Sequence, residues 1–243
     1  KDNYLILNNH PLTPKFYGII KGKTELIIEF IKGKTLYEFN KYELNEKIRI
    51  IFEILIIFEY LHRNHLIYRD LKPNNILIDQ NKTPVLIDFD RMLKYDGSFN
   101  NILHTNDFSS AFIAPEINDN NFSYECDIYS IGQMIYYIIN EKSPNQDNLL
   151  NDFEKCIEMK QIYLNCTNKD VTKRPKISEL ILDFLLNFHS QIKIDNLYET
   201  FIDCFNNICD ENSKENIQNL LKDQNNIEEN YDSEQLVIEG LMY

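Results

Sequence analysis

The sequence predicts an α+β fold that is mainly α, and three patterns support this prediction. Residues 43–65 place apolar side chains three and four positions apart, which is the spacing of one face of a long, largely buried helix. Residues 124–139 form a second strongly apolar helix. The apolar runs at 16–20 and 26–31 flank a turn that contains glycine, and together they predict a β-hairpin.

Other elements are predicted from shorter patterns. Residues 76–78 and 85–87 are two short β runs on either side of a turn. Residues 149–165 read as a further helix. Residues 92–112 show no convincing period, and a loop of this length inside a compact domain usually serves a function.

The last predicted helix covers residues 177–189. Its start is assigned either to Ser178 as the cap or to the preceding Pro175, because both residue types are common at helix starts. Beyond about residue 190 the composition shifts to Asn, Asp and Glu with isolated apolar pairs. Some helix is expected there, but no site.

Composition and charge exclude several classes of function. The 243 residues are 43% hydrophobic, which is ample for a core. The net charge of -13 argues against nonspecific binding to nucleic acid or acidic lipid, because both require a positive surface. No apolar run reaches membrane-spanning length. The chain begins at Lys1 without a Met or a signal-like segment, as expected of a fragment.

The five cysteines include no C-x-x-C pair and have no neighbouring cluster of histidines. Reduced thiols are therefore favoured over a zinc site, and they are typical of a cytoplasmic protein. The oligomeric state is left undetermined by the sequence.

The residues that carry chemistry are concentrated at 68–75. Asp70, Lys72 and Asn75 lie within six positions of one another, in a loop stiffened by a proline. Such a group can receive a hydroxyl proton, steady a phosphate and hold a metal ion. The second β run delivers Asp88 close by, and Asp88 opposite Asn75 would supply the hard oxygen ligands that Mg²⁺ prefers.

These residues resemble the motifs of eukaryotic protein kinases, specifically of their C-terminal lobe. The catalytic loop H-R-D-L-K-x-x-N of the family corresponds to Y-R-D-L-K-P-N-N at 68–75, and its D-F-G motif to D-F-D at 88–90. The A-P-E motif corresponds to residues 114–116. Asp127 matches the helix-F aspartate of the family, and Arg174 matches the arginine that pairs with the A-P-E glutamate.

The resemblance implies a protein-kinase-like C-lobe with a remnant of the N-lobe sheet. Residues 1–36 would be the remnant and the hinge, 37–189 the C-lobe, and 190–243 an extension of unknown function. The implied activity is transfer of the ATP γ-phosphoryl to Ser or Thr hydroxyls of a protein substrate. Lys72 resembles the serine/threonine class rather than the tyrosine class.

Site roles are implied by position in the motifs. Asp70 would accept or orient the substrate hydroxyl, and Lys72 would neutralise the transferred phosphoryl group. Asn75 and Asp88 would hold Mg²⁺ and, through it, ATP. Asp127 and Arg174 are interpreted as structural residues.

The resemblance also assigns the adenine site. Glu29 to Ile31 would form the hinge whose backbone bonds the base, behind Ile28 as gatekeeper. Leu77 would lie beneath the ring. Ser109 occupies the place of the usual threonine that contacts the substrate residue after the acceptor.

Two kinds of departure support an alternative, a pseudokinase scaffold without catalysis. The Gly-rich loop, the strand Lys and the helix-C Glu of the family have no counterpart in these residues, so this chain alone is expected to be inactive. Tyr68 replaces the family's His, and Asp90 replaces a Gly where a permissive backbone is expected.

Three basic side chains have further expected roles. Arg69 could pair with a phosphate in the segment after residue 92 and order it. The candidate acceptors of that phosphate are Ser98, Thr105, Ser109 and Ser110. His62 and His65 end a helix, where packing or capping is favoured over catalysis.

Overall fold

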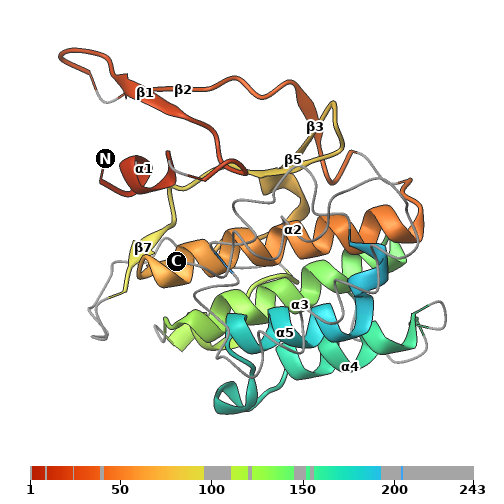
Figure 1. Ribbon diagram of the computed structural model, residues 1–243. Helices are drawn as coiled ribbons and strands as arrows, with labels where there is room; N and C mark the ends of the chain where they lie inside the picture. Colours follow the sequence, from red (N-terminus) through yellow and green to blue (C-terminus); the bar gives the residue numbers. More distant parts are fainter. Residues whose placement is uncertain are drawn as a thin grey trace, which may run out of the picture.

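The predicted α+β fold, mainly α, is confirmed by the computed structural model. Four helices are stacked in one part of the molecule, and small antiparallel strand pairs lie on the side of the longest helix (Figure 1). No helix in the described residues is long and apolar enough to cross a bilayer. The structure describes residues 2–8, 10–23, 25–38, 41–95, 111–119, 122–144, 152–153, 156–192 and 204.

Helix α2 (Leu44–Arg63) is the central element and matches the prediction closely. It starts after Glu43, whose backbone N–H donates to the Glu46 carboxylate at 3.1 Å. Nearly all of its residues from Lys47 onward are buried, because it packs against α3 and α5 on one side and the strands on another. An apolar helix of this kind is stable only inside a core.

Helix α3 (Tyr124–Asn140) is also confirmed. It packs closely on α4 (Ile157–Cys166), and a Cβ added to Gly132 would stand 2.7 Å from the Cβ of Cys166. Only glycine permits this approach of the two helices.

The start predicted for the third helix, 149–165, is wrong, since α4 begins at Ile157. Asp152 and Phe153 lie in a turn instead. The hydroxyl of Tyr136 donates to the Asp152 carboxylate, and Phe153 is buried among aromatic rings. These tertiary contacts favour the turn over the local helical pattern.

Helix α5 (Ile177–Phe188) is confirmed, but its cap is neither Ser178 nor Pro175, the two residues to which its start was assigned. Lys176 occupies the cap position, and its N–H donates to the Glu179 carboxylate at 2.9 Å. Ser178 is already inside the helix. Glu179 was the informative residue, because its carboxylate accepts the Lys176 N–H, a donor that the helix itself leaves unpaired.

The strands form three small antiparallel groups. The predicted hairpin is β1 (Phe16–Ile19) with β2 (Leu26–Ile28), and the predicted second pair is β5 (Ile76–Asp79) with β6 (Pro84–Leu86). Strand β3 (Gly33–Thr35) adds to the edge of β5 and was not predicted. A Cβ at Gly33 would lie 2.3 Å from the Ile78 carbonyl oxygen, so this pairing requires glycine.

Several short elements complete the fold and were not predicted either. Strand β4 (Leu66–Ile67) pairs with β7 (Leu93–Lys94), and a one-turn helix α1 (Asp2–Leu7) lies near β1 (Figure 1). These elements are too short for a hydrophobic period to be recognised in the sequence. The 3₁₀ turns are η1 (Pro73–Asn75), η2 (Pro115–Asp119), η4 (Val171–Lys173) and η5 (His189–Gln191).

Glu53 is a buried acid on α2. Its Oε1 accepts from Arg49 at 2.7 Å, whereas Oε2 has no hydrogen-bond partner within the described residues. Burial raises the pKa of Glu53 to about 7, which Arg49 opposes and Asp79 reinforces. Because the folded pKa lies above the unfolded value of 4.5, the folded state binds the proton more tightly. The resulting stability is present below pH 4.5 and is lost as the pH rises to about 7.

We therefore expect the stability of the wild type relative to Glu53→Gln to fall between pH 4.5 and 7, by up to about 1.4 kcal/mol per pH unit. Urea unfolding at a series of pH values measures this. Glu46→Gln is the matched control on the same helix, because a hydrogen bond from Lys82 lowers the pKa of Glu46. The stability of the wild type relative to Glu46→Gln should therefore be lost as the pH falls below 4.5, which is the opposite direction. A pH-independent difference for Glu53→Gln would contradict the prediction.

Candidate active site

The loop that follows β4 is held by a single carboxylate from α3. Asp127 is completely buried and accepts the backbone N–H of Tyr68 at 2.9 Å and that of Arg69 at 2.8 Å. His62, in the last turn of α2, lies with its Nε2 3.0 Å from the same carboxylate. Arg69 has a φ of 69°, in the left-handed region. Asp127 thus stabilises an unfavourable backbone bend at the start of the predicted catalytic loop.

Tyr68 takes the place of the family's histidine without leaving a gap. Its ring is fully buried and meets the rings of Phe58 and Phe89 edge-on. Its hydroxyl donates to the Ile87 carbonyl. Burial raises the pKa of Tyr68, and the carboxylates of Asp70 and Asp88 add to this effect. The tyrosine therefore stays neutral and ties the catalytic loop to the end of β6.

Three of the predicted site residues meet at one carboxylate. The Oδ2 atom of Asp70 accepts from Lys72 Nζ at 2.8 Å and from Asn75 Nδ2 at 3.0 Å. Asn75 Nδ2 also donates to the backbone carbonyl of Asp70 at 2.8 Å. Within the described residues no hydrogen bond reaches Oδ1 of Asp70. The carboxylate is thus fixed through one oxygen and has the other available.

Asp88 follows β6 and is exposed at the edge of this cluster. The Ile87 N–H donates to the Asn75 carbonyl at 3.0 Å, which brings the segment before Asp88 alongside η1. Asp88 itself has a φ of 62°, whereas Asp90 is not among the residues with positive φ. The expected need for a permissive backbone at position 90 is therefore wrong; the bend falls two residues earlier, and Asp90 adds no strain.

The donor set at this edge fits a magnesium ion. The amide nitrogen of Asn75 is committed to Asp70, which leaves its amide oxygen for a ligand. Asp88 offers an exposed carboxylate. Both are hard oxygen donors, and Mg²⁺ in nucleotide sites takes only one or two protein ligands together with phosphate and water.

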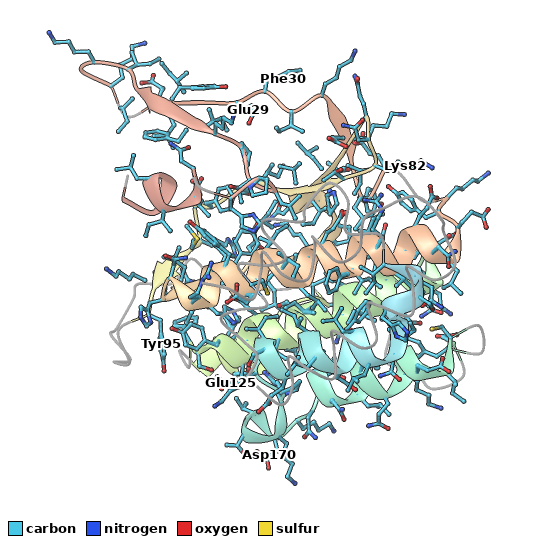
Figure 2. All side chains as sticks on the ribbon, in the orientation of Figure 1. Glu29, Phe30, Lys82, Tyr95, Glu125 and Asp170 are labelled. Atoms are coloured by element: carbon cyan, nitrogen blue, oxygen red, sulfur yellow. The ribbon has the colours of Figure 1, made fainter. Side chains whose placement is uncertain are left out.

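The predicted hinge lies between β2 and β3, where Figure 2 labels Glu29 and Phe30. The N–H of Glu29 donates to the Lys15 carbonyl at 2.7 Å, so this donor is already used. Within the described residues, no backbone hydrogen bond involves Ile31. Leu77 is half-buried on β5 and alternates with the core residues Ile76 and Ile78, so its side chain is on the strand face away from that core.

Glu116 and Arg174 form the ion pair that the motifs imply. Both guanidinium terminal nitrogens reach the carboxylate, with Nη2 3.0 Å from Oε2. Arg174 also donates to the carbonyls of Glu125 and Asn168 and lies over the ring of Tyr129. Its side chain is fully buried. All three guanidinium nitrogens donate hydrogen bonds, as a buried charge requires, and the structural interpretation of Arg174 is supported.

Sequence reasoning did not identify two residues of the site. Arg91 lies with its Nε 3.9 Å from Oδ2 of Asp70, and nothing in the local pattern pointed to it. His62 was assigned to packing or capping, and it packs against Asp127 rather than capping a helix. His65 lies beyond the end of α2, with its Nδ1 3.2 Å from the Tyr124 hydroxyl.

The side chain of Arg69 is buried rather than exposed to solvent. Its Nε donates to the Arg91 carbonyl at 2.6 Å, and its guanidinium lies 4.8 Å from the centre of the Phe122 ring. Burial lowers the pKa of Arg69, opposed by Asp127. The serines and threonine proposed as its phosphorylated partners lie outside the described residues.

A carboxylate held by a lysine and an asparagine, with a second carboxylate after the neighbouring strand, matches the arrangement that the protein-kinase motifs predict. The family model described as "Protein kinase domain" matches residues 4–223. The chain belongs to the protein kinase family.

Known relatives agree with this assignment. The chain is 33% identical over 154 residues to the carbon catabolite-derepressing protein kinase of Candida glabrata, covering 60% of this chain and 24% of that protein. It is 32% identical over 201 residues to a probable serine/threonine-protein kinase KIN1 homolog of Enterocytozoon bieneusi, covering 79% and 32%. For the SNF1-like protein kinase ssp2 of Schizosaccharomyces pombe the identity is 28% over 189 residues, covering 73% and 32%. The chain spans a third or less of the length of these relatives.

We expect Asp127→Asn to destabilise the protein by about 1–3 kcal/mol, because an amide cannot accept all the hydrogen bonds that the carboxylate receives. The loss should be largest in the loop, so hydrogen exchange at the Tyr68 and Arg69 amides should accelerate more than exchange in α5. Asp90→Asn, at an exposed aspartate nearby, serves as the control. Unchanged exchange at both amides would show that Asp127 does not hold the loop.

Proposed function

We propose that this protein transfers the γ-phosphoryl group of ATP to serine or threonine hydroxyls of a protein substrate. The observation that carries the proposal is the state of Asp70. One carboxylate oxygen is held by Lys72 and Asn75, and the other accepts no hydrogen bond within the described residues. A fixed carboxylate with one available oxygen is what a substrate hydroxyl needs in order to be oriented.

Asp70 and Lys72 would have complementary roles. Oδ1 of Asp70 would accept the hydrogen bond of the attacking hydroxyl and orient it toward the phosphorus. Lys72, with its side chain about one-third exposed, would turn its ammonium to the transferred group and offset its negative charge. Positioning and charge neutralisation supply most of the catalysis in phosphoryl transfer, since the protein has little covalent chemistry to perform.

Asn75 and Asp88 would hold Mg²⁺, which when bound neutralises the charge of the ATP phosphates. The amide nitrogen of Asn75 also fixes Asp70, so the same side chain would bind the metal ion and hold the proton acceptor. The adenine base would lie at the hinge, where the backbone groups of Ile31 make no hydrogen bond within the described part of the chain. Glu29 would contribute its carbonyl rather than its N–H, and Leu77 would support the ring.

Serine and threonine are favoured as acceptors for two reasons. Lys72 stands two residues after Asp70, as in the serine/threonine class. The E. bieneusi relative is named a probable serine/threonine-protein kinase. We also propose a cytoplasmic location, which is supported by the buried Cys156 and Cys166, since neither forms a disulfide within the described residues.

The second candidate function is a scaffold that binds partners without catalysis. The observation that favours it is the lack of a G-x-G-x-x-G pattern among the six glycines. Two of its other supports are weak in the structure, because Tyr68 is well packed and Asp90 is unstrained. Phosphorylation of protein substrate by the intact protein with Mg-ATP would exclude the scaffold.

We expect Asp70→Asn to lower the rate of phosphate transfer by about 10²–10⁴-fold, because the amide cannot accept a proton. Transfer of labelled phosphate from ATP to a serine- or threonine-containing protein measures this, with the melting temperature as a folding check. Asp183→Asn, on α5, is the matched control and should leave the rate unchanged. The intact protein is assayed. An equal rate for Asp70→Asn would refute the catalytic role, and transfer absent in the intact wild-type protein would favour the scaffold.

A further inference from the structure

The imidazole of His62 is packed against two aromatic rings. His62 lies in the last turn of α2, and its side chain is only 6% exposed. The ring of Phe58, one turn earlier, stands at right angles to it, with 6.0 Å between the ring centres. The ring of Tyr124, the first residue of α3, lies 4.7 Å away. These contacts limit the directions in which the two ring nitrogens can point.

One of these nitrogens donates to Asp127. The Nε2 atom of His62 lies 3.0 Å from Oδ2 of Asp127, which is completely buried. Because an ionised carboxylate only accepts hydrogen bonds, Nε2 is the nitrogen that carries the proton. In the part of the chain that the structure describes, His62 makes no hydrogen bond or ion pair with Asp70. Any effect of His62 on the reaction is therefore indirect.

The carboxylate of Asp127 accepts from three donors. Its Oδ1 accepts the N–H of Arg69, and its Oδ2 accepts the N–H of Tyr68 as well as Nε2–H of His62. The last torsion of an aspartate side chain has broad preferences, so its rotamer alone does not fix where the two oxygens lie. Of these three donors, only His62 comes from outside the loop. It can therefore fix the rotation of the carboxylate independently of the loop.

That rotation matters for Asp70, because Asp70 follows Arg69 directly in the chain. Asp127 holds two successive backbone N–H groups, so a turn of its carboxylate shifts the peptide units just before Asp70. Arg69 has a φ of 69°, in the left-handed region, which a residue with a side chain adopts only when its surroundings hold it there. A loosened carboxylate would let this bend relax and carry Asp70 with it.

We propose that His62 is a positioning residue for phosphate transfer, which fixes the Asp127 carboxylate and so places Asp70 where the acceptor hydroxyl arrives. This inference rests on the proposed kinase function and adds a residue to the same site. Misplacing a reacting group by about 1 Å can lower a rate by about 10²-fold, and the loss of one donor in three should cost less, about tenfold in kcat. The KM values should change little, because other residues bind ATP and substrate.

The test compares His62→Gln with His62→Asn in the intact protein with Mg-ATP. The amide nitrogen of glutamine can take the place of Nε2, whereas that of asparagine lies near the place of Nδ1 and does not reach Asp127. We expect His62→Asn to lower kcat by about tenfold, with KM for ATP and for a serine-containing protein nearly unchanged. His62→Gln should stay within about threefold of the wild type. If His62 only filled space, the two variants would be alike, because both remove the ring.

Hydrogen exchange gives a second readout that needs no activity. Exchange at the Tyr68 and Arg69 amides should accelerate in His62→Asn, less so in His62→Gln, and exchange in α5 should not change. His65→Asn is the matched control, because it removes an exposed imidazole just beyond the end of α2. Asparagine also tolerates the φ of 57° at this position. The control should keep the wild-type kcat and exchange.

The outcomes separate the two proposals. A wild-type kcat in folded His62→Asn, equal losses in the two variants, or unchanged exchange at both amides would overturn the role of His62 and leave the kinase function standing. A His62→Gln protein that does not fold would also overturn it, because the ring and not the donor would then be required. If only His62→Asn fails to fold, His62→Leu, which is similar in volume to histidine and has no donor, takes its place. Absence of phosphate transfer by the intact wild type would overturn the proposed function and this inference with it.

Discussion

The carboxylate of Asp127 is the interaction on which the arrangement of the site depends. It lies on α3, is completely buried, and accepts two backbone N–H groups of the catalytic loop while His62 of α2 lies against it. A buried carboxylate is unfavourable unless its oxygens are hydrogen-bonded, and here the partners come from two parts of the chain, the last turn of α2 and the loop after β4. The loop can therefore take its conformation only when α2 and α3 are packed. This links the integrity of the helical core to the position of Asp70.

Aromatic packing accompanies the polar contacts around Asp127. Tyr68 is buried against Phe58 and Phe89, and its hydroxyl reaches the Ile87 carbonyl just before Asp88. One side chain thus couples the segment that holds Asp70, the proposed proton acceptor, to the segment that holds the proposed metal ligand. At the start of α3, where Arg174 also donates to the Glu125 carbonyl, the Glu116–Arg174 pair joins the A-P-E segment to the residues just before α5.

Basic side chains gather at the site, although the chain as a whole is acidic. In this acidic protein, Arg69 and Lys72 of the loop after β4 lie near Arg91 of the segment after β6, and Lys72 and Arg91 both lie within 4 Å of the Asp70 carboxylate. Arg69 is buried and stabilises the main chain of Arg91, whereas Arg91 reaches solvent. The two arginines therefore differ in their environment, because the side chain of Arg69 is removed from solvent and that of Arg91 is not.

Much of the fold and of the candidate site could be predicted from local sequence patterns. The long apolar periods determined α2 and α3, and the spacing of Asp70, Lys72 and Asn75 within one stiffened loop determined that they would meet. Contacts between distant residues were decided only by the tertiary structure. Strand β3 exists because Gly33 can approach the Ile78 carbonyl, α4 starts late because Tyr136 holds Asp152, and Arg91 reaches Asp70 because the chain after β6 folds back. Periodicity reports which face of an element is buried, and it carries no information about which distant side chain will complete a hydrogen bond or an ion pair.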